Sequence, residues 1–210
     1  MAGEVHGVSE IHGILLAAGE SRRMGFPKPL LKIGAETYLA RLVTAMLTAV
    51  PHLTVVIGAH AAETRAAAPL DARVTIVENH EFARGQLSSL KAGLRASAST
   101  ASAVMVHLID HPMVAPTTFS GIVAEYQRSG KPIVIARYKD RRGHPVIFGR
   151  ALFDELLAAS EEQGARAVVH AEPSRVGHFE TADPAILMDL DTPADVAQAG
   201  LNAPARSNER

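Results

Sequence analysis

An apolar run from Ile11 to Ala18 leads directly into a loop that contains Gly19, Gly25 and Lys28. Short apolar runs that stop at a glycine are typical of parallel strands covered on both faces. A loop of this composition lets backbone N–H groups approach phosphate oxygens, because no bulky side chain intervenes. The stretch therefore predicts a buried strand followed by an anion-binding loop.

Strand and helix patterns alternate along the rest of the chain. Strands are predicted at residues 54–59, 74–78, 104–109, 133–138, 145–148, 176–180 and 186–189. Helices are predicted at residues 37–49, 61–68, 87–98, 117–128, 151–159 and 165–170, and from residue 193 onwards. This alternation implies βαβ units with right-handed crossovers, and so an α/β fold with a mostly parallel sheet. A turn at residues 139–143 adds at least one antiparallel strand.

Composition limits the classes of function. The 210 residues are 47% hydrophobic and carry a net charge of -1, which gives no electrostatic reason to expect nucleic-acid or membrane binding. The chain has no cysteine, so disulfides, thiolate metal sites and a cysteine nucleophile are excluded. No apolar stretch approaches membrane-spanning length, and the first ten residues are too polar for a signal peptide. We expect a cytoplasmic protein that acts on small molecules, with one domain at residues 11–200 and flexible termini at 1–10 and 202–210.

The first loop offers several phosphate ligands. Gly19 and Gly25 permit turns, Ser21 can hydrogen-bond a phosphate, and Arg23 and Lys28 supply positive charge. Prolines on both sides of the lysine predict a stiff, extended backbone there. The loop is neither a Walker A loop nor a Gly-x-Gly-x-x-Gly fingerprint. An ordinary basic surface turn remains the alternative.

A second segment, residues 79–90, follows a predicted strand and opens a predicted helix. Gly85 and the free N–H groups around Ser88 can therefore receive a ligand. Helix capping by Ser88 and Ser89 is the competing interpretation.

Two carboxylates are candidate metal ligands. Asp110 comes directly after a predicted buried strand, where it can hold a hard cation such as Mg²⁺ or cap the following turn. Asp189 and Asp191 fall on the same face of a predicted extended segment, and either is a candidate for the second carboxylate. Thr192 and Pro193 then form a helix start.

The first loop resembles the Leu-Ala-Ala-Gly-x-Ser-x-Arg-Met-Gly-x-x-Lys motif of the MobA-like NTP transferases, and is most similar to that of molybdenum cofactor cytidylyltransferases. Further similar segments follow in order, namely residues 79–89, Asp-His-Pro at 110–112, Gly-His-Pro at 143–145, Gly-Ala-Arg at 164–166 and Asp-x-Asp-Thr-Pro at 189–193. The resemblance implies the three-layer, Rossmann-like nucleotide-diphospho-sugar transferase fold of the glycosyltransferase-A type. The guanylyltransferase branch, which uses GTP, has Ala-Gly-Gly where this chain has Ala-Ala-Gly, so CTP is favoured.

The resemblance also implies roles for single residues. The implied nucleotide-binding positions are Leu16, Ala17, Ala18, Gly19, Ser21, Arg23, Gly25, Lys28, Asn79, Gly85, Ser88 and Ser89. The implied acceptor-binding positions are His111, Gly143, His144 and Arg166, although His111 departs from the family pattern and is expected to face solvent. Arg23, Lys28 and Asp110 are the implied catalytic residues, and Asp110 and Asp191 the implied ligands of Mg²⁺.

The implied reaction is nucleotidyl transfer from an NTP to a phosphorylated acceptor such as molybdopterin, with release of pyrophosphate. One alternative is a nucleotidyltransferase for a sugar phosphate or an alcohol phosphate. Another is a non-catalytic nucleotide- or cofactor-binding module, and a molybdoenzyme or its chaperone is a candidate partner.

Overall fold

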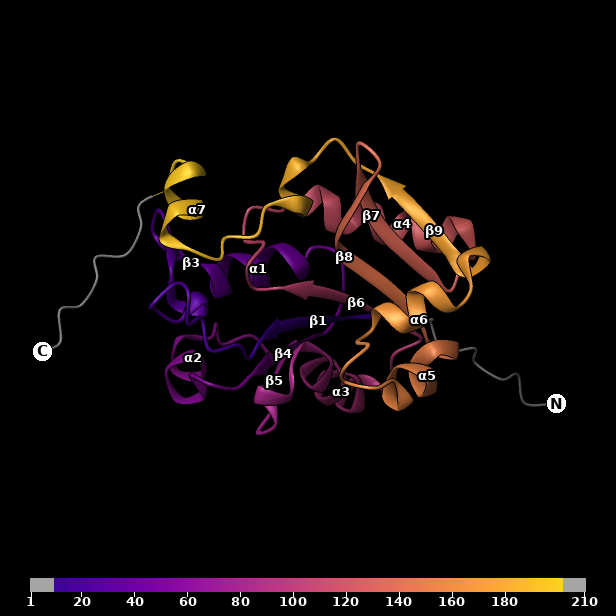
Figure 1. Cartoon of the computed structure of the whole chain (residues 1–210), viewed down its shortest axis with the longest axis horizontal. Helices are drawn as coiled ribbons and strands as arrows, with labels where there is room; N and C mark the ends of the chain where they lie inside the picture. Colours follow the sequence, from indigo (N-terminus) through magenta and orange to yellow (C-terminus); the bar gives the residue numbers. More distant parts are fainter. Residues whose placement is uncertain (1–9, 202–210) are drawn as a thin grey trace, which may run out of the picture.

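The computed structural model describes residues 10–201, in which seven strands form one sheet in the order β5-β4-β1-β6-β8-β7-β9 (Figure 1). The strands are β1 (Ile11–Ala17), β4 (Leu53–Ile57), β5 (Val74–Glu78), β6 (Ala103–Leu108), β7 (Ile133–Tyr138), β8 (Arg141–Gly149) and β9 (Val176–Glu180). Among these strands β8 alone runs antiparallel, pairing with β6 on one side and β7 on the other. The α/β class and the mostly parallel sheet with an antiparallel strand are confirmed. The predicted flexible termini lie outside the described residues, apart from Glu10.

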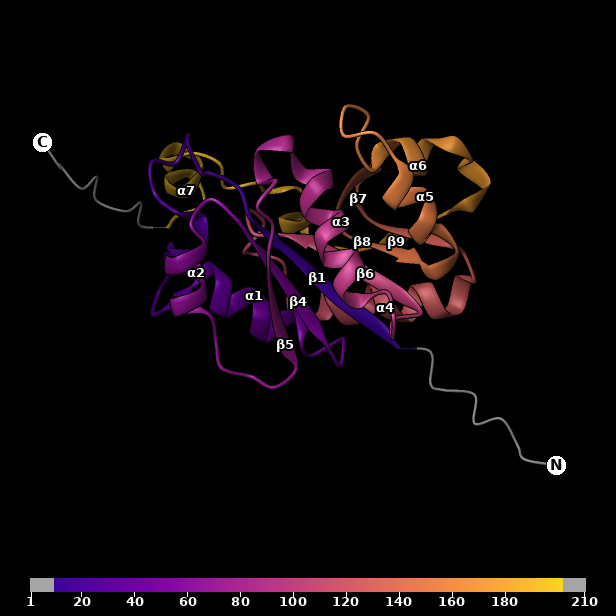
Figure 2. The same cartoon turned by 90° about the horizontal axis from the view of Figure 1, so that it is seen from below.

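Helices cover both faces of the sheet, as Figure 2 shows. They are α1 (Tyr38–Met46), α2 (Ala61–Ala67), α3 (Gln86–Ser97), α4 (Pro116–Ser129), α5 (Phe153–Ala158), α6 (Arg166–Ala171) and α7 (Pro193–Gln198). Alternation along β1 divides the core: Leu15 packs with the residues of α1 and α4, whereas Ile14 and Leu16 pack with those of α3 and α5. None of the described helices is long and apolar enough to cross a membrane.

Short elements complete the chain. They are the 3₁₀ turns η1 (Lys28–Leu30), η2 (Phe82–Arg84), η3 (Arg150–Leu152), η4 (Pro173–Arg175) and η5 (Pro184–Leu187), and the small hairpin of β2 (Lys32–Ile33) and β3 (Glu36–Thr37).

Three local predictions were wrong. The predicted strand at 186–189 does not form: its first two residues belong to η5, and the next two lie in no helix or strand. Pro184 favours a helical turn, and the Asp183 side chain accepts a hydrogen bond from the N–H of Ala185. The predicted extended backbone at Lys28 is the turn η1, which tolerates a proline in its first turn. The predicted turn at 139–143 is shorter, because Arg141 already pairs with β7.

Candidate active site

The first loop folds back on itself through Ser21. This residue has a positive φ of 54°, and its carbonyl accepts hydrogen bonds from the N–H groups of Met24 and Gly25. Its hydroxyl accepts from the N–H of Lys28 at 3.1 Å. Gly25 also has a positive φ, of 71°, a conformation that favours glycine. The loop therefore holds Lys28 near the carboxyl end of β1, where both line the same cavity.

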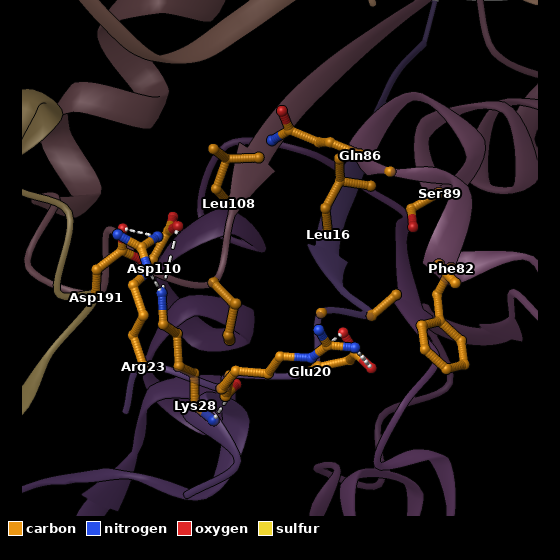
Figure 3. Close-up of a pocket in the computed structure, with 17 residues that line it drawn as sticks. Leu16, Glu20, Arg23, Lys28, Phe82, Gln86, Ser89, Leu108, Asp110 and Asp191 are labelled. Atoms are coloured by element: carbon orange, nitrogen blue, oxygen red, sulfur yellow. Dashed lines mark hydrogen bonds and ion pairs between the residues drawn. The ribbon is translucent and has the colours of Figure 1, made fainter. Parts of the chain in front are cut away.

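Lys28 lies between two carboxylates that are distant in sequence. Its ammonium donates to Asp191 and is 3.6 Å from Oδ2 of Asp110, and the lysine side chain is only 10% exposed (Figure 3). Arg23 donates to the other oxygen of Asp191 at 2.5 Å. Partial burial acts to raise the pKa of Asp191, but the hydrogen bond and charge of Lys28, with the charge of Arg23, outweigh it and lower that pKa. Asp191 is thus held as a carboxylate.

The backbone brings these carboxylates together. The carbonyl of Asp110, just after β6, accepts a hydrogen bond from the N–H of Leu190 at 2.8 Å. Asp195 accepts from the N–H groups of Asp191 and Thr192, and Thr192 accepts from the N–H of Asp195, which forms the capping box of α7. The start of α7 therefore fixes the position of Asp191.

This pair of carboxylates suits a hard divalent cation. Oδ1 of Asp110 is buried and has no hydrogen-bond partner among the described residues. A second carboxylate, Asp191, converges on the same ammonium. Oxygen ligands of this kind bind Mg²⁺ or Mn²⁺, so the donor set fits such an ion.

A cavity of about 550 Å³ opens beside these residues. Ten of the predicted site residues line it, namely Leu16, Ala18, Gly19, Ser21, Arg23, Lys28, Gly85, Ser89, Asp110 and Asp191. Others that were not predicted also line it, among them Glu20, Arg22, Phe82, Gln86 and Leu108. In Figure 3 the charged residues Lys28 and Asp191 lie on one side, and Phe82 and Ser89 on the other. A charged wall facing a wall with an aromatic ring suits a ligand with a polyphosphate and a flat base.

Asn79 and Ser88 do not line this cavity and instead support its wall. The Asn79 amide donates to the hydroxyls of Ser88 and Ser89, and its carbonyl oxygen accepts from the N–H of Glu81. The capping role considered for the two serines is wrong, because α3 begins after Gly85, which has a φ of 108° and no side-chain cap.

Three histidines cluster beside Asp110, whose Oδ1 lies 3.7 Å from Nε2 of His111. The ring centroids of His107, His111 and His144 lie 5.6 to 6.4 Å apart. His107 and His111 are buried, so the expectation that His111 faces solvent is wrong. The backbone carbonyl of His111 lies 3.1 Å from Nε2 of His107, within hydrogen-bonding distance. Burial, together with the neighbouring His111, lowers the pKa of His144 to about 4. His144 is therefore neutral near pH 7.

None of the four predicted acceptor residues, His111, Gly143, His144 and Arg166, lines the cavity. Gly143 packs against η5, where a Cβ atom would come within 2.1 Å of the carbonyl oxygen of Ile186. Arg166 is exposed at the first turn of α6. Ala17 and Gly25 also lie outside the lining, the former buried at the end of β1 and the latter in the first loop.

Residues 13–176 match the family model of the MobA-like NTP transferase domain. The chain belongs to this family. It is 26% identical to the purine catabolism protein PucB of Bacillus subtilis, over 87% of this chain and 92% of that protein. The crystal structure of Rv0371c from Mycobacterium tuberculosis is similar with a TM-score of 0.78 and 32% identity, over 90% of this chain and 96% of that one. A manganese complex of Rv0371c matches with a TM-score of 0.69 and 30% identity, over 90% and 97% of the two chains.

The family model ends before Asp191, whose position follows from the contacts described above. The cavity of this MobA-like NTP transferase is therefore lined by residues within the matched range 13–176 and by Asp191, which lies beyond it. Converging carboxylates, a buried lysine and an arginine are the groups that phosphoryl-type transfer uses for positioning and charge neutralisation.

Proposed function

We propose that this protein transfers a nucleoside monophosphate from an NTP, with CTP favoured, to a phosphorylated acceptor such as molybdopterin, and releases pyrophosphate. The observation that carries the proposal is the contact of Lys28 with Asp110 and Asp191 at the edge of the cavity. Mere binding of a nucleotide does not require two carboxylates to converge beside a buried lysine. This argues against the non-catalytic module.

We further propose Mg²⁺ as the ion, held by Asp110 and Asp191. The buried, unpartnered Oδ1 of Asp110 supports this assignment, as does the similar Rv0371c structure that is a manganese complex. When bound, such an ion would supply positive charge to offset that of the α-phosphate and would help to orient it.

The side chains of the first loop act on the triphosphate. Arg23 and Lys28 pair with Asp191 in this structure, and both line the cavity, where their charges can also act on phosphate oxygens. There they would offset the negative charge that develops as pyrophosphate leaves. N–H groups of the loop around Gly19 lie at the same cavity.

The acceptor needs no strong general base if it is a phosphate monoester, because its oxygen is already ionised. His111 and His144 remain the candidate acceptor residues. Burial and the neighbouring His111 lower the pKa of His144 to about 4, which fits a hydrogen-bonding role more than a proton-accepting one. The Ala-Ala-Gly segment at residues 17–19 supports CTP over GTP only through the family pattern. A molybdoenzyme or its chaperone remains the candidate partner.

The test is pyrophosphate release from CTP, GTP, ATP and UTP in the presence of Mg²⁺, with molybdopterin or a sugar phosphate as acceptor. We expect release with CTP and molybdopterin. Asp191→Ala should abolish it, whereas Asp189→Ala, which changes an exposed carboxylate two residues away, should retain it. Release with a sugar phosphate alone would favour the second enzyme class. If no NTP releases pyrophosphate with any acceptor, both enzyme proposals fail and the non-catalytic binding module is the hypothesis that stands.

A further inference from the structure

Glu10, His12 and His52 form a cluster at the amino ends of β1 and β4. One ligand atom of each side chain lies within 4.8 Å of the others. The cluster is separated from the carboxyl-end cavity by the length of β1, which is roughly 20 Å for its seven residues. It has no part in the proposed reaction.

The sheet register brings the three side chains together. Glu10 and His12 are two residues apart along the extended chain, so they lie on the same face. Gly13 pairs with Leu53 in the parallel ladder, and its N–H donates to the carbonyl of His52 at 2.8 Å. His12 and His52 each stand one residue before this pair. They are consequently neighbours, with ring centroids 5.0 Å apart.

The distances within the cluster are close to those between ligands of one metal ion. Oε2 of Glu10 is 3.5 Å from Nε2 of His12 and 3.9 Å from Nε2 of His52. Two ligand atoms on a tetrahedral Zn²⁺ are separated by roughly 3.3 Å, given bonds of about 2.0–2.1 Å. Small side-chain adjustments would therefore bring the three atoms onto one ion.

His12 supplies an independent reason to expect a ligand. Its side chain is 7% exposed, and its Nε2 atom has no hydrogen-bond partner among the described residues. An unpaired buried polar atom destabilises the folded protein unless a ligand satisfies it.

We propose that Glu10, His12 and His52 bind a divalent transition metal ion, Zn²⁺ or one of its neighbours, that links the start of β1 to the start of β4. Two imidazoles and one carboxylate favour such an ion over Mg²⁺, which prefers oxygen ligands. Water completes the coordination on the exposed side of His52, whose side chain is 54% exposed. The ion stabilises the sheet at the edge opposite the cavity.

The test is a calorimetric titration of the full-length protein, first stripped of metal, with Zn²⁺ in the presence of excess Mg²⁺. The Mg²⁺ competes with Zn²⁺ for the carboxylates of the cavity. His52→Ala is the principal variant, since an exposed side chain can be removed without disturbing the core. We expect the wild type to bind one Zn²⁺ that His52→Ala and Glu10→Gln do not bind. Zn²⁺ should also raise the melting temperature of the wild type, and not that of the variants.

His80→Ala is the matched control, because His80 is an exposed histidine that lies 3.5 Å from a single carboxylate, Glu78. This variant should keep the Zn²⁺ site. Equal binding by the wild type and His52→Ala, or no binding by the wild type, would overturn the proposal. These outcomes do not bear on nucleotidyl transfer, which is measured separately with Mg²⁺.

Discussion

His144 should make the protein less stable in mild acid. Burial and the nearby His111 lower its pKa from the ordinary value of 6.5 to about 4 in the folded state. Between these two values the unfolded chain binds a proton that the folded chain rejects, so acidification favours unfolding. The contribution of neutral His144 is fully present above pH 6.5 and is lost as the pH falls towards 4.

The size of the effect follows from the two pKa values. Their difference corresponds to about 3 kcal/mol in total. Between pH 7 and pH 5 the same two values give a loss of about 2 kcal/mol. His107, whose pKa burial also lowers, should add to the loss in the wild type.

Urea unfolding at pH 7 and pH 5 measures this loss directly. In His144→Gln the loss of unfolding free energy between the two pH values should be about 2 kcal/mol smaller than in the wild type. His170→Gln, which changes an exposed histidine of α6, should keep the wild-type loss. An equal loss in the wild type and His144→Gln would refute the claim that this imidazole is held neutral.

Three further substitutions probe the site and its supports. Lys28→Met should lower kcat roughly 10²- to 10³-fold and raise the affinity of the nucleotide-free protein for Mn²⁺, because the ammonium that pairs with Asp191 is gone; unchanged values of both would contradict its role. Asp183→Ala should cost about 1–3 kcal/mol in urea unfolding, since its carboxylate accepts from the N–H of Ala115 at the start of α4 and from η5. Gly143→Ala should lower the melting temperature, because its Cβ would collide with the carbonyl of Ile186; an unchanged value would mean that η5 moves aside without cost.

The sequence predicted the parts of the site that depend on strand order. Asp110 follows a buried strand, and the carboxyl end of β6 lies beside that of β1 because the two strands pair in parallel. The fixed geometry of a parallel sheet thus places the aspartate near the loop at Lys28 without reference to any side-chain packing. The capping box at Thr192 was also predictable, since it depends only on local sequence.

Features that depend on packing between distant segments were not predictable. His111 is polar and follows a strand, which suggested exposure, but it is buried in a cluster with His107 and His144. The apolar run at 186–189 suggested a strand, but this segment pairs with no strand of the sheet. Instead η5 packs against Gly143. Nothing in the sequence around Phe82 indicated a role in binding. It lines the cavity from its place in η2.

The ion pair of Lys28 and Asp191 joins residues 163 positions apart. During synthesis on a ribosome, β1, β4, β5 and β6 can pair before the segment that carries Asp191 has been made, because all four strands precede it by many residues. Such a partial chain would contain the loop that carries Lys28 without the carboxylate of Asp191. The complete set of charged groups proposed to bind a metal and a triphosphate should therefore form only after the segment that carries Asp191 and α7 has been made.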